Sequence, residues 1–137
     1  RGIASAPLMG RELINKQRIP ELIISSPALR AKTTAELLAG VVGYNRAIHF
    51  EKNFYFGNTE EIIELIRKTD NSIKRFMIVG HNPTLEYLLE KLIIQHVAYS
   101  FPTAAIASIN FEIEKWEAVS KNSGNLEWLI VPKDLIL

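Results

Sequence analysis

Residues 76–88 read FMIVGHNPTLEYL and contain a junction from which the fold of this chain can be inferred. The apolar run at its start is typical of a strand buried on both faces, and we place this strand at Arg75–Gly80. Asn82 is a good helix N-cap, and Pro83 suits the first helical position because its φ angle is already helical. The apolar spacing that follows predicts a helix over Thr84–Ile94.

Residues 22–31, LIISSPALRA, have the same arrangement. A short apolar run predicts a buried strand over Glu21–Ser25. Ser26 is the expected N-cap and Pro27 the expected first helical residue of a helix over Ala28–Leu38. Each of the two helices would therefore begin at the carboxyl end of a strand, which is where ligands bind in open α/β sheets.

The other patterns complete an α/β fold. They predict a helix over Ala6–Lys16, and they place the end of the helix that begins at Ala28 near Gly40 or Gly43. A weak strand over Ala47–Phe50 follows, and then a helix over Thr59–Lys68 with Thr59 as its N-cap. The last predicted elements are strands over Ala105–Glu112, Lys115–Ser120 and Glu127–Val131. Strands separated by helices and then a strand-rich tail indicate three layers, α/β/α, around a mainly parallel sheet with an antiparallel edge. No repeat or long linker divides the chain, so we expect a single domain.

Composition narrows the classes of function. The 137 residues include 16 Lys and Arg against 15 Asp and Glu, a formal charge of +1. This balance gives no support to a dedicated binder of nucleic acid or of acidic membranes, and the basic residues at 67–68 and 74–75 are expected to lie in a solvated loop. The chain has no cysteine, which excludes a disulfide framework, a thiolate metal site and a cysteine nucleophile. A reducing compartment, the cytoplasm, fits this composition.

Two side chains at the strand–helix junctions suit a phosphate group. Arg30 falls in the first turn of its helix, and its guanidinium can bind two oxygens of one phosphoryl group. His81 directly precedes its helix, where an imidazole can donate a hydrogen bond to a phosphoryl oxygen. Either residue alone is more simply explained as a surface or capping residue. Their occurrence at two similar junctions favours a shared anion site near two helix N-termini.

Three segments carry a family resemblance: APLMGREL at 6–13, ISSPALRAKTTAELL at 24–38 and FMIVGHNPTLEYLLEKL at 76–92. They resemble the histidine phosphatase superfamily, in particular its SixA-type phosphohistidine phosphatases, and WLIVPKDL at 128–135 is similar to the ends of these proteins. The resemblance implies a phosphoglycerate mutase-like fold and phosphoryl transfer through a phosphohistidine enzyme intermediate, with no metal or other cofactor. It aligns Arg30 with the family's phosphate-binding arginine and His81 with its second active-site histidine.

The chain departs from this family at the nucleophile, which the family carries in an Arg–His–Gly tripeptide at the end of its first strand. That tripeptide is absent, and we expect the only other histidines, His49 and His96, to be structural or solvated. Arg1–Gly2 resembles the start of the family's first helix. We therefore expect the catalytic strand to precede Arg1 and to lie between the strands at Arg75–Gly80 and Ala105–Glu112. On this hypothesis, residues 1–137 are a phosphohistidine phosphatase-like domain that is incomplete at its N-terminus.

The general acid and the substrate remain open at this stage. Glu51, Glu60 and Glu61 are carboxylates near the expected mouth of the site, but spacing cannot place them within reach of a leaving atom, and we assign none. Only a short loop separates Phe50 from Thr59, where relatives that act on small metabolites commonly carry a larger cap. An open site favours phosphohistidine on a signalling protein, such as a histidine phosphotransfer domain. The alternatives are a phosphatase of small phosphate esters from the same superfamily and a phosphate-binding domain without turnover.

Overall fold

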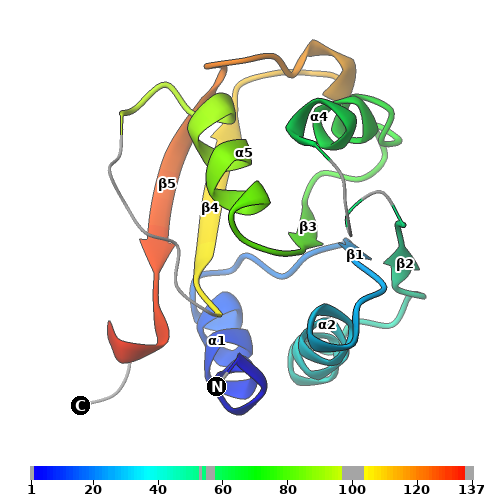
Figure 1. Cartoon of the computed structure of the whole chain (residues 1–137), viewed down its shortest axis with the longest axis vertical. Helices are drawn as coiled ribbons and strands as arrows, with labels where there is room; N and C mark the ends of the chain where they lie inside the picture. Colours follow the sequence, from blue (N-terminus) through cyan, green and yellow to red (C-terminus); the bar gives the residue numbers. More distant parts are fainter. Residues whose placement is uncertain (1, 53, 55–57, 97–103, 135–137) are drawn as a thin grey trace.

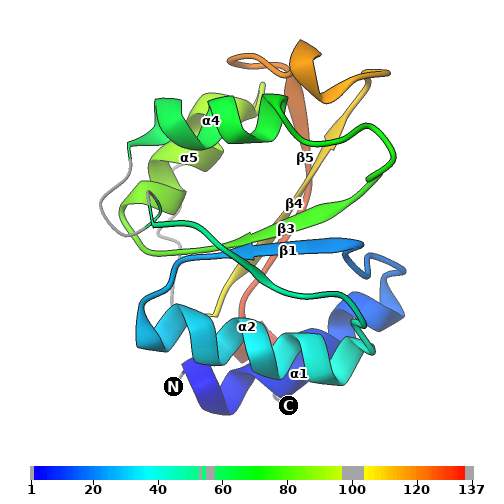
Figure 2. The same ribbon diagram turned by 90° about the vertical axis from the view of Figure 1, so that its right-hand side faces the viewer.

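Helices cover both faces of the strands in the computed structural model, which describes residues 2–52, 54, 58–96 and 104–134 (Figures 1 and 2). In Figure 2, α1 (Gly2–Asn15) and α2 (Leu29–Val42) lie below the strands, and α4 (Thr59–Arg67) and α5 (Thr84–Leu92) lie above them. The three-layer α/β/α arrangement predicted from the sequence is therefore confirmed. None of the described helices is long and apolar enough to cross a membrane.

A parallel sheet contains both strands that the two junctions predict. Its order is β2 (His49–Phe50), β1 (Leu22–Ser25) and β3 (Phe76–Val79), with β1 in the middle. Leu22 lies opposite Phe76 and Ser25 opposite Val79, so β1 and β3 end at the same level. This register brings the segments that follow the two strands to one edge of the sheet.

An antiparallel pair forms the other part of the strand layer. β4 (Ile106–Phe111) pairs with β5 (Gly124–Ile130), with an irregularity between Ser108 and Ile109. The strand predicted over Lys115–Ser120 is wrong, because this segment contains the short 3₁₀ helix η1 (Trp116–Ala118). A second 3₁₀ helix, η2 (Pro132–Asp134), follows β5.

Trp116 gives the reason for this difference. Its indole Nε1 donates to the carbonyl oxygen of Ile73 at 2.7 Å, and its backbone N–H donates to Oδ1 of Asn71 at 2.9 Å. Its ring meets that of Phe76 edge to face, with centroids 4.8 Å apart. The polar groups of the segment are thus bonded to the loop before β3, and β-type composition alone did not reveal this tertiary contact.

The helix starts also differ from the prediction. Helix α2 begins at Leu29, preceded by Ala28 in extended conformation, and Ser26 Oγ accepts a hydrogen bond from the Ala28 N–H at 3.2 Å. Helix α5 begins at Thr84, after a cis peptide bond between Asn82 and Pro83. Ser26 and Asn82 therefore precede turns rather than cap the helices directly.

Two other helix boundaries follow local side-chain chemistry. Asn58, and not Thr59, is the N-cap of α4, and its Oδ1 accepts from the Glu61 N–H at 2.9 Å. Helix α2 ends at Gly43, whose φ of 75° is left-handed and suits a residue without a Cβ atom. The predicted end near Gly40 or Gly43 is therefore confirmed at the second glycine.

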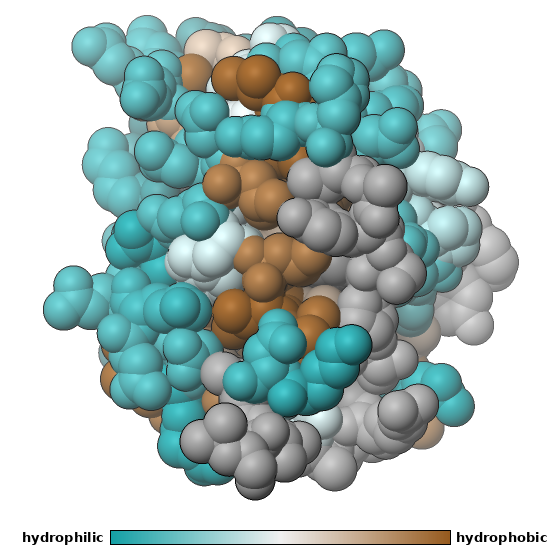
Figure 3. Space-filling model, turned by 90° about the vertical axis from the view of Figure 1, so that its left-hand side faces the viewer, coloured by the Kyte–Doolittle hydropathy of each residue, from teal (hydrophilic) through white to brown (hydrophobic). Residues whose placement is uncertain are grey.

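Apolar side chains gather on both sides of the strand layer. The cluster beneath it has as its buried members Ala6, Met9, Leu13, Leu38, Val42 and Ile130. The cluster above it is formed mainly by α4 and α5, with Ile62, Ile63, Ile66, Leu88 and Leu92 among its buried members. On the side of the molecule where β5 lies, hydrophobic residues also form a column at the surface beside hydrophilic residues (Figure 3). Apolar surface therefore remains accessible beside the antiparallel pair.

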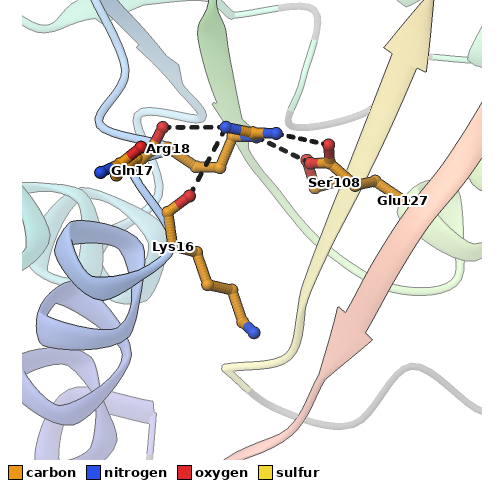
Figure 4. A network of polar contacts seen from close by, with 5 residues as sticks. All are labelled: Lys16, Gln17, Arg18, Ser108 and Glu127. Carbon is orange, nitrogen blue, oxygen red and sulfur yellow. Dashed lines mark hydrogen bonds and ion pairs between the residues drawn. The ribbon is translucent and has the colours of Figure 1, made fainter.

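A polar cluster joins the loop after α1 to the antiparallel pair (Figure 4). Arg18 binds Glu127 through both ends of its guanidinium, with Nε to Oε1 at 2.8 Å and Nη2 to Oε2 at 2.6 Å. Ser108 Oγ also donates to Glu127 Oε1 at 2.8 Å. The hydrogen bond from Arg18, followed by that from Ser108 and the charge of Arg18, holds the pKa of Glu127 at about 2 although partial burial opposes this shift.

We expect Glu127→Gln to lower the free energy of unfolding by about 1 kcal/mol at pH 7, since a half-exposed bidentate ion pair is worth about that much. A lowered pKa in the folded state adds stability above the ordinary carboxyl pKa. That stability is lost as the pH falls from about 5 toward 2. Urea unfolding at pH 7 and pH 2.5 measures both effects, and the exposed Glu90→Gln is the matched control. A difference between wild type and Glu127→Gln that does not shrink in acid would contradict this account.

Candidate functional site

His81 lies at the carboxyl end of the parallel sheet, two residues after the last residue of β3. Its Nε2 is 2.8 Å from Oγ of Ser26, which follows β1 directly. Ser26 is fully buried, and its backbone N–H donates to the carbonyl oxygen of Val79 at 2.9 Å. The two strand ends are thus bonded to each other, and the hydrogen bond to Ser26 orients the imidazole ring.

Sequence reasoning missed this function of Ser26 because it treated the residue only as a helix cap. The available signal was the register of parallel strands. If the two apolar runs pair in parallel and end at the same level, the residues that follow them are neighbours across the sheet. Ser26 and Gly80 would then face each other, with His81 next in the chain.

Arg30 lies in the first turn of α2, and its side chain is exposed. It lines the same cavity of about 720 Å³ as Gly80, His81 and Asn82. Within the described part of the chain, its guanidinium has no hydrogen-bond or ion-pair partner. An exposed guanidinium beside a helix start, without a carboxylate partner, is available to bind an anion from solution.

The other two histidines lie away from this position. His49 is in β2, two strand spacings or roughly 10 Å from β3. Its exposed ring is 3.5 Å from Oε2 of Glu51. His96 is exposed and follows α5. Neither therefore joins His81 and Arg30 at the strand ends.

Of the three carboxylates considered as general acids, Glu60 and Glu61 lie in the first turn of α4, and Glu51 follows β2. Glu60 accepts a hydrogen bond from Lys91 Nζ at 2.9 Å, and this contact, with the charge of Lys91, lowers the pKa of Glu60. Glu61 is exposed in the first turn of α4, where a negative charge favours the helix dipole. The backbone N–H of Glu51 donates to the Ser25 carbonyl oxygen at 2.9 Å. No group of three metal-ligating side chains occurs among the described residues.

The whole chain is similar to solved phosphohistidine phosphatase structures. A structure of the protein histidine phosphatase SixA complexed with tungstate matches 98% of this chain and 83% of its own, with a TM-score of 0.84 and 21% identity. The chain has the SixA fold. A protein from Nakamurella, assigned as a phosphohistidine phosphatase SixA, matches 95% of this chain and 81% of its own, with a TM-score of 0.81 and 16% identity. One from Agrobacterium tumefaciens, with the same assignment, matches 95% and 79%, with a TM-score of 0.76 and 24% identity.

Sequence comparison gives a weaker signal. No protein-family model matches the chain. An uncharacterized protein of Mycobacterium leprae, ML1117, is 24% identical over 141 aligned residues, which cover 97% of this chain and 84% of that protein. Likeness to SixA is therefore established at the level of the fold. It agrees with the phosphoglycerate mutase-like architecture that the motifs predicted. Arg1, which with Gly2 resembles the start of the family's first helix, lies outside the described residues.

We expect Ser26→Ala to lower the free energy of unfolding by about 1–2 kcal/mol, because its hydroxyl is bonded to both His81 and the Ala28 N–H. It should also move the His81 imidazole resonances in an NMR spectrum. Ser25→Ala is the matched control, since Ser25 is equally buried but its Oγ donates only to the Ser26 carbonyl oxygen, at 2.9 Å. Equal movement of the His81 signals in both variants would show that Ser26 does not orient the ring.

Proposed function

We propose that this protein is a phosphohistidine phosphatase that acts on a phosphohistidine carried by another protein. One observation carries the proposal: His81, oriented by Ser26, lines one cavity at the carboxyl ends of two parallel strands with the guanidinium of Arg30, which has no partner among the described residues. The SixA fold of the chain supports the same conclusion. That SixA structure is complexed with tungstate, a tetrahedral oxyanion that resembles a phosphate group.

The two side chains have complementary parts in phosphoryl transfer. Arg30 would bind two non-bridging oxygens of the phosphoryl group through the fork of its guanidinium. His81 would donate a hydrogen bond to an oxygen of the same group and stabilise the charge that develops there. The substrate's P–N bond breaks as phosphorus bonds to an attacking histidine nitrogen, and the leaving imidazole takes up a proton from solvent. Water then hydrolyses the enzyme phosphohistidine.

Exposed apolar side chains favour a protein as the substrate. Leu29, next to Arg30, is 78% exposed, and Phe50, the last residue of β2, is 39% exposed. Tyr87 of α5 is 57% exposed. Leu29 and Tyr87 lie in the first turns of the helices that follow β1 and β3, and Phe50 ends the neighbouring parallel strand β2. Aromatic and aliphatic side chains that are exposed around a polar centre are typical of protein-binding surfaces.

A substrate comparison tests the proposal. Initial rates are measured with a phosphorylated histidine phosphotransfer domain and with p-nitrophenyl phosphate. We expect kcat/KM to favour the phosphoprotein. Leu29→Ser should lower kcat/KM for the phosphoprotein about tenfold, or about 1.4 kcal/mol, and leave that for the ester unchanged. A higher kcat/KM for the ester would contradict the proposed protein substrate and favour the small-ester alternative.

A phosphate-binding domain without turnover is the second candidate. It is favoured by the absence, among the described residues, of a further histidine at the position of His81 and Arg30. Isothermal titration with tungstate, combined with the hydrolysis assays, distinguishes the two candidates, since both functions require oxyanion binding and only the first requires hydrolysis. Tungstate binding with no hydrolysis of either substrate would support the second candidate, and failure to bind tungstate would contradict both.

A further inference from the structure

A second exposed cation lies beside the candidate site, on the helix that carries Arg30. Lys32 follows Leu29 by three residues in α2, and side chains at this spacing share one face of a helix. Both side chains are exposed, and neither of them lines the cavity that Arg30 and His81 line. The start of α2 therefore presents Arg30 to the cavity and Leu29 with Lys32 to a neighbouring surface.

Phe50 extends this surface from the parallel sheet. It is the last residue of β2 and pairs in register with Ser25, at the end of β1 that leads to the site. Its side chain is exposed, and the centroid of its ring is 5.6 Å from Nζ of Lys32. α2 and β2 are neighbours at the lower right of Figure 1. We call the exposed side chains of Leu29, Lys32 and Phe50 the α2–β2 surface.

The ammonium of Lys32 is available to an acceptor from another molecule. Within the described part of the chain it has no hydrogen-bond or ion-pair partner, although the exposed Glu36 lies one turn further along α2. Its position over the Phe50 ring favours the cation and leaves its N–H donors available. A carboxylate is the acceptor that suits this position best, because opposite charges strengthen the hydrogen bond. The side chains of Leu29 and Phe50 provide apolar contact beside it.

Charge differs between the two sides of the site. The helix that follows His81, α5, has Glu86 in its first turn and Glu90 one turn later. A carboxylate on a binding partner would be repelled by these residues and attracted by Arg30 and Lys32 on α2. The acidic part of a partner should therefore face α2, and this preference orients the partner on the site.

We propose that the α2–β2 surface binds an apolar side chain and a carboxylate of the protein that carries the phosphohistidine, with Lys32 as the residue that selects the carboxylate. The inference rests on the proposed function, because it concerns the substrate of the same site. Arg30 and Lys32 are two residues apart in α2, which places their Cα atoms about 5 Å apart, and their side chains face different surroundings. The partner's carboxylate should therefore lie roughly 10 Å from its phosphohistidine, since the length of both side chains adds to the Cα separation.

Binding of stable peptides tests this surface without any hydrolysis. Three fluorescent peptides carry a central phosphonate analogue of phosphohistidine and adjoining leucines. They differ in having aspartate, asparagine or lysine three residues to either side, roughly 10 Å away in an extended chain. Fluorescence anisotropy at constant ionic strength gives their dissociation constants for the protein. We expect the aspartate peptide to bind about fivefold more tightly than the asparagine peptide, and the lysine peptide to bind more weakly than both.

Charge reversal identifies the residue responsible. Lys32→Glu should weaken binding of the aspartate peptide at least about tenfold and strengthen that of the lysine peptide, a gain that a misfolded variant cannot produce. Lys68→Glu is the matched control, because Lys68 is exposed at the end of α4, in the other helix layer, and carries the same charge. It should change each dissociation constant less than about twofold.

The outcomes separate this surface from the phosphatase proposal. No binding of the aspartate peptide, similar affinities for all three peptides, or equal effects of the two substitutions would overturn the α2–β2 surface as the binding site. Peptides of the same sequences with phosphohistidine itself are then assayed for release of phosphate. Hydrolysis without a charge preference would retain the phosphatase and overturn the surface, whereas charge-dependent binding without hydrolysis would retain the surface and contradict the phosphatase.

Discussion

Replacing Arg30 by alanine is expected to raise the dissociation constant for tungstate about 100-fold. The reason is that a guanidinium forms two charge-assisted hydrogen bonds to one tetrahedral oxyanion, an interaction of about 2–3 kcal/mol. Arg30 is well placed for this, since it is exposed, lines the His81 cavity and has no partner within the described part of the chain. Arg30→Lys should retain the charge without the planar fork and so lose about tenfold. Isothermal titration calorimetry at constant ionic strength gives all three constants.

Lys32 provides the matched control. It lies two residues further along α2, is exposed, and its Nζ is 5.6 Å from the centroid of the Phe50 ring. It does not line the cavity. Lys32→Ala removes the same unit of charge from the same helix and should change tungstate affinity less than about twofold, because exposed charges at a distance are screened. Similar losses in Lys32→Ala and Arg30→Ala would show a general electrostatic attraction and remove Arg30 from the binding site.

The central part of the fold could be predicted from two short segments. Each has an apolar run that is too short for a helix and ends at a serine or glycine, followed by a helical pattern. Local chemistry alone therefore indicates a strand that leads into a helix. Apolar runs of this kind favour parallel pairing of β1 and β3, whereas their equal register is an observation from the structure. His81 and Arg30 could be selected because they stand at these strand ends.

Features that depend on contacts between distant segments could not be predicted in this way. Trp116 is part of a segment with alternating apolar and polar residues, yet its indole and backbone N–H groups bond to residues more than 40 positions earlier in the chain. The hydrogen bond from Ser26 to His81 likewise joins residues 55 positions apart. Neither leaves a local pattern in composition. The Pro83 junction also differs from the predicted helix start, because the backbone turns before α5 begins at Thr84.

A large loss of stability is expected when a side chain is introduced at Gly124, the buried first residue of β5. A Cβ atom placed there would be 2.5 Å from Cγ2 of Ile109 and 2.7 Å from Cε1 of Phe111. It would also be 3.1 Å from the carbonyl oxygen of Leu92, a backbone atom that cannot move by a rotamer change. The Gly124 carbonyl oxygen accepts from the Ile94 N–H at 2.8 Å, so any shift of β5 also strains its junction with the end of α5.

We therefore expect Gly124→Ala to lower the free energy of unfolding by about 2–3 kcal/mol, the cost typical of overpacking a tightly filled site. Gly40→Ala is the control, because Gly40 is exposed in α2 and a Cβ atom there meets nothing within 4 Å. That change should raise the free energy of unfolding by about 0.5–1 kcal/mol through helix propensity. Urea titration followed by circular dichroism measures both. A Gly124→Ala variant as stable as the parent would show that β4, β5 and α5 are packed less closely at this point than the contacts at Gly124 indicate.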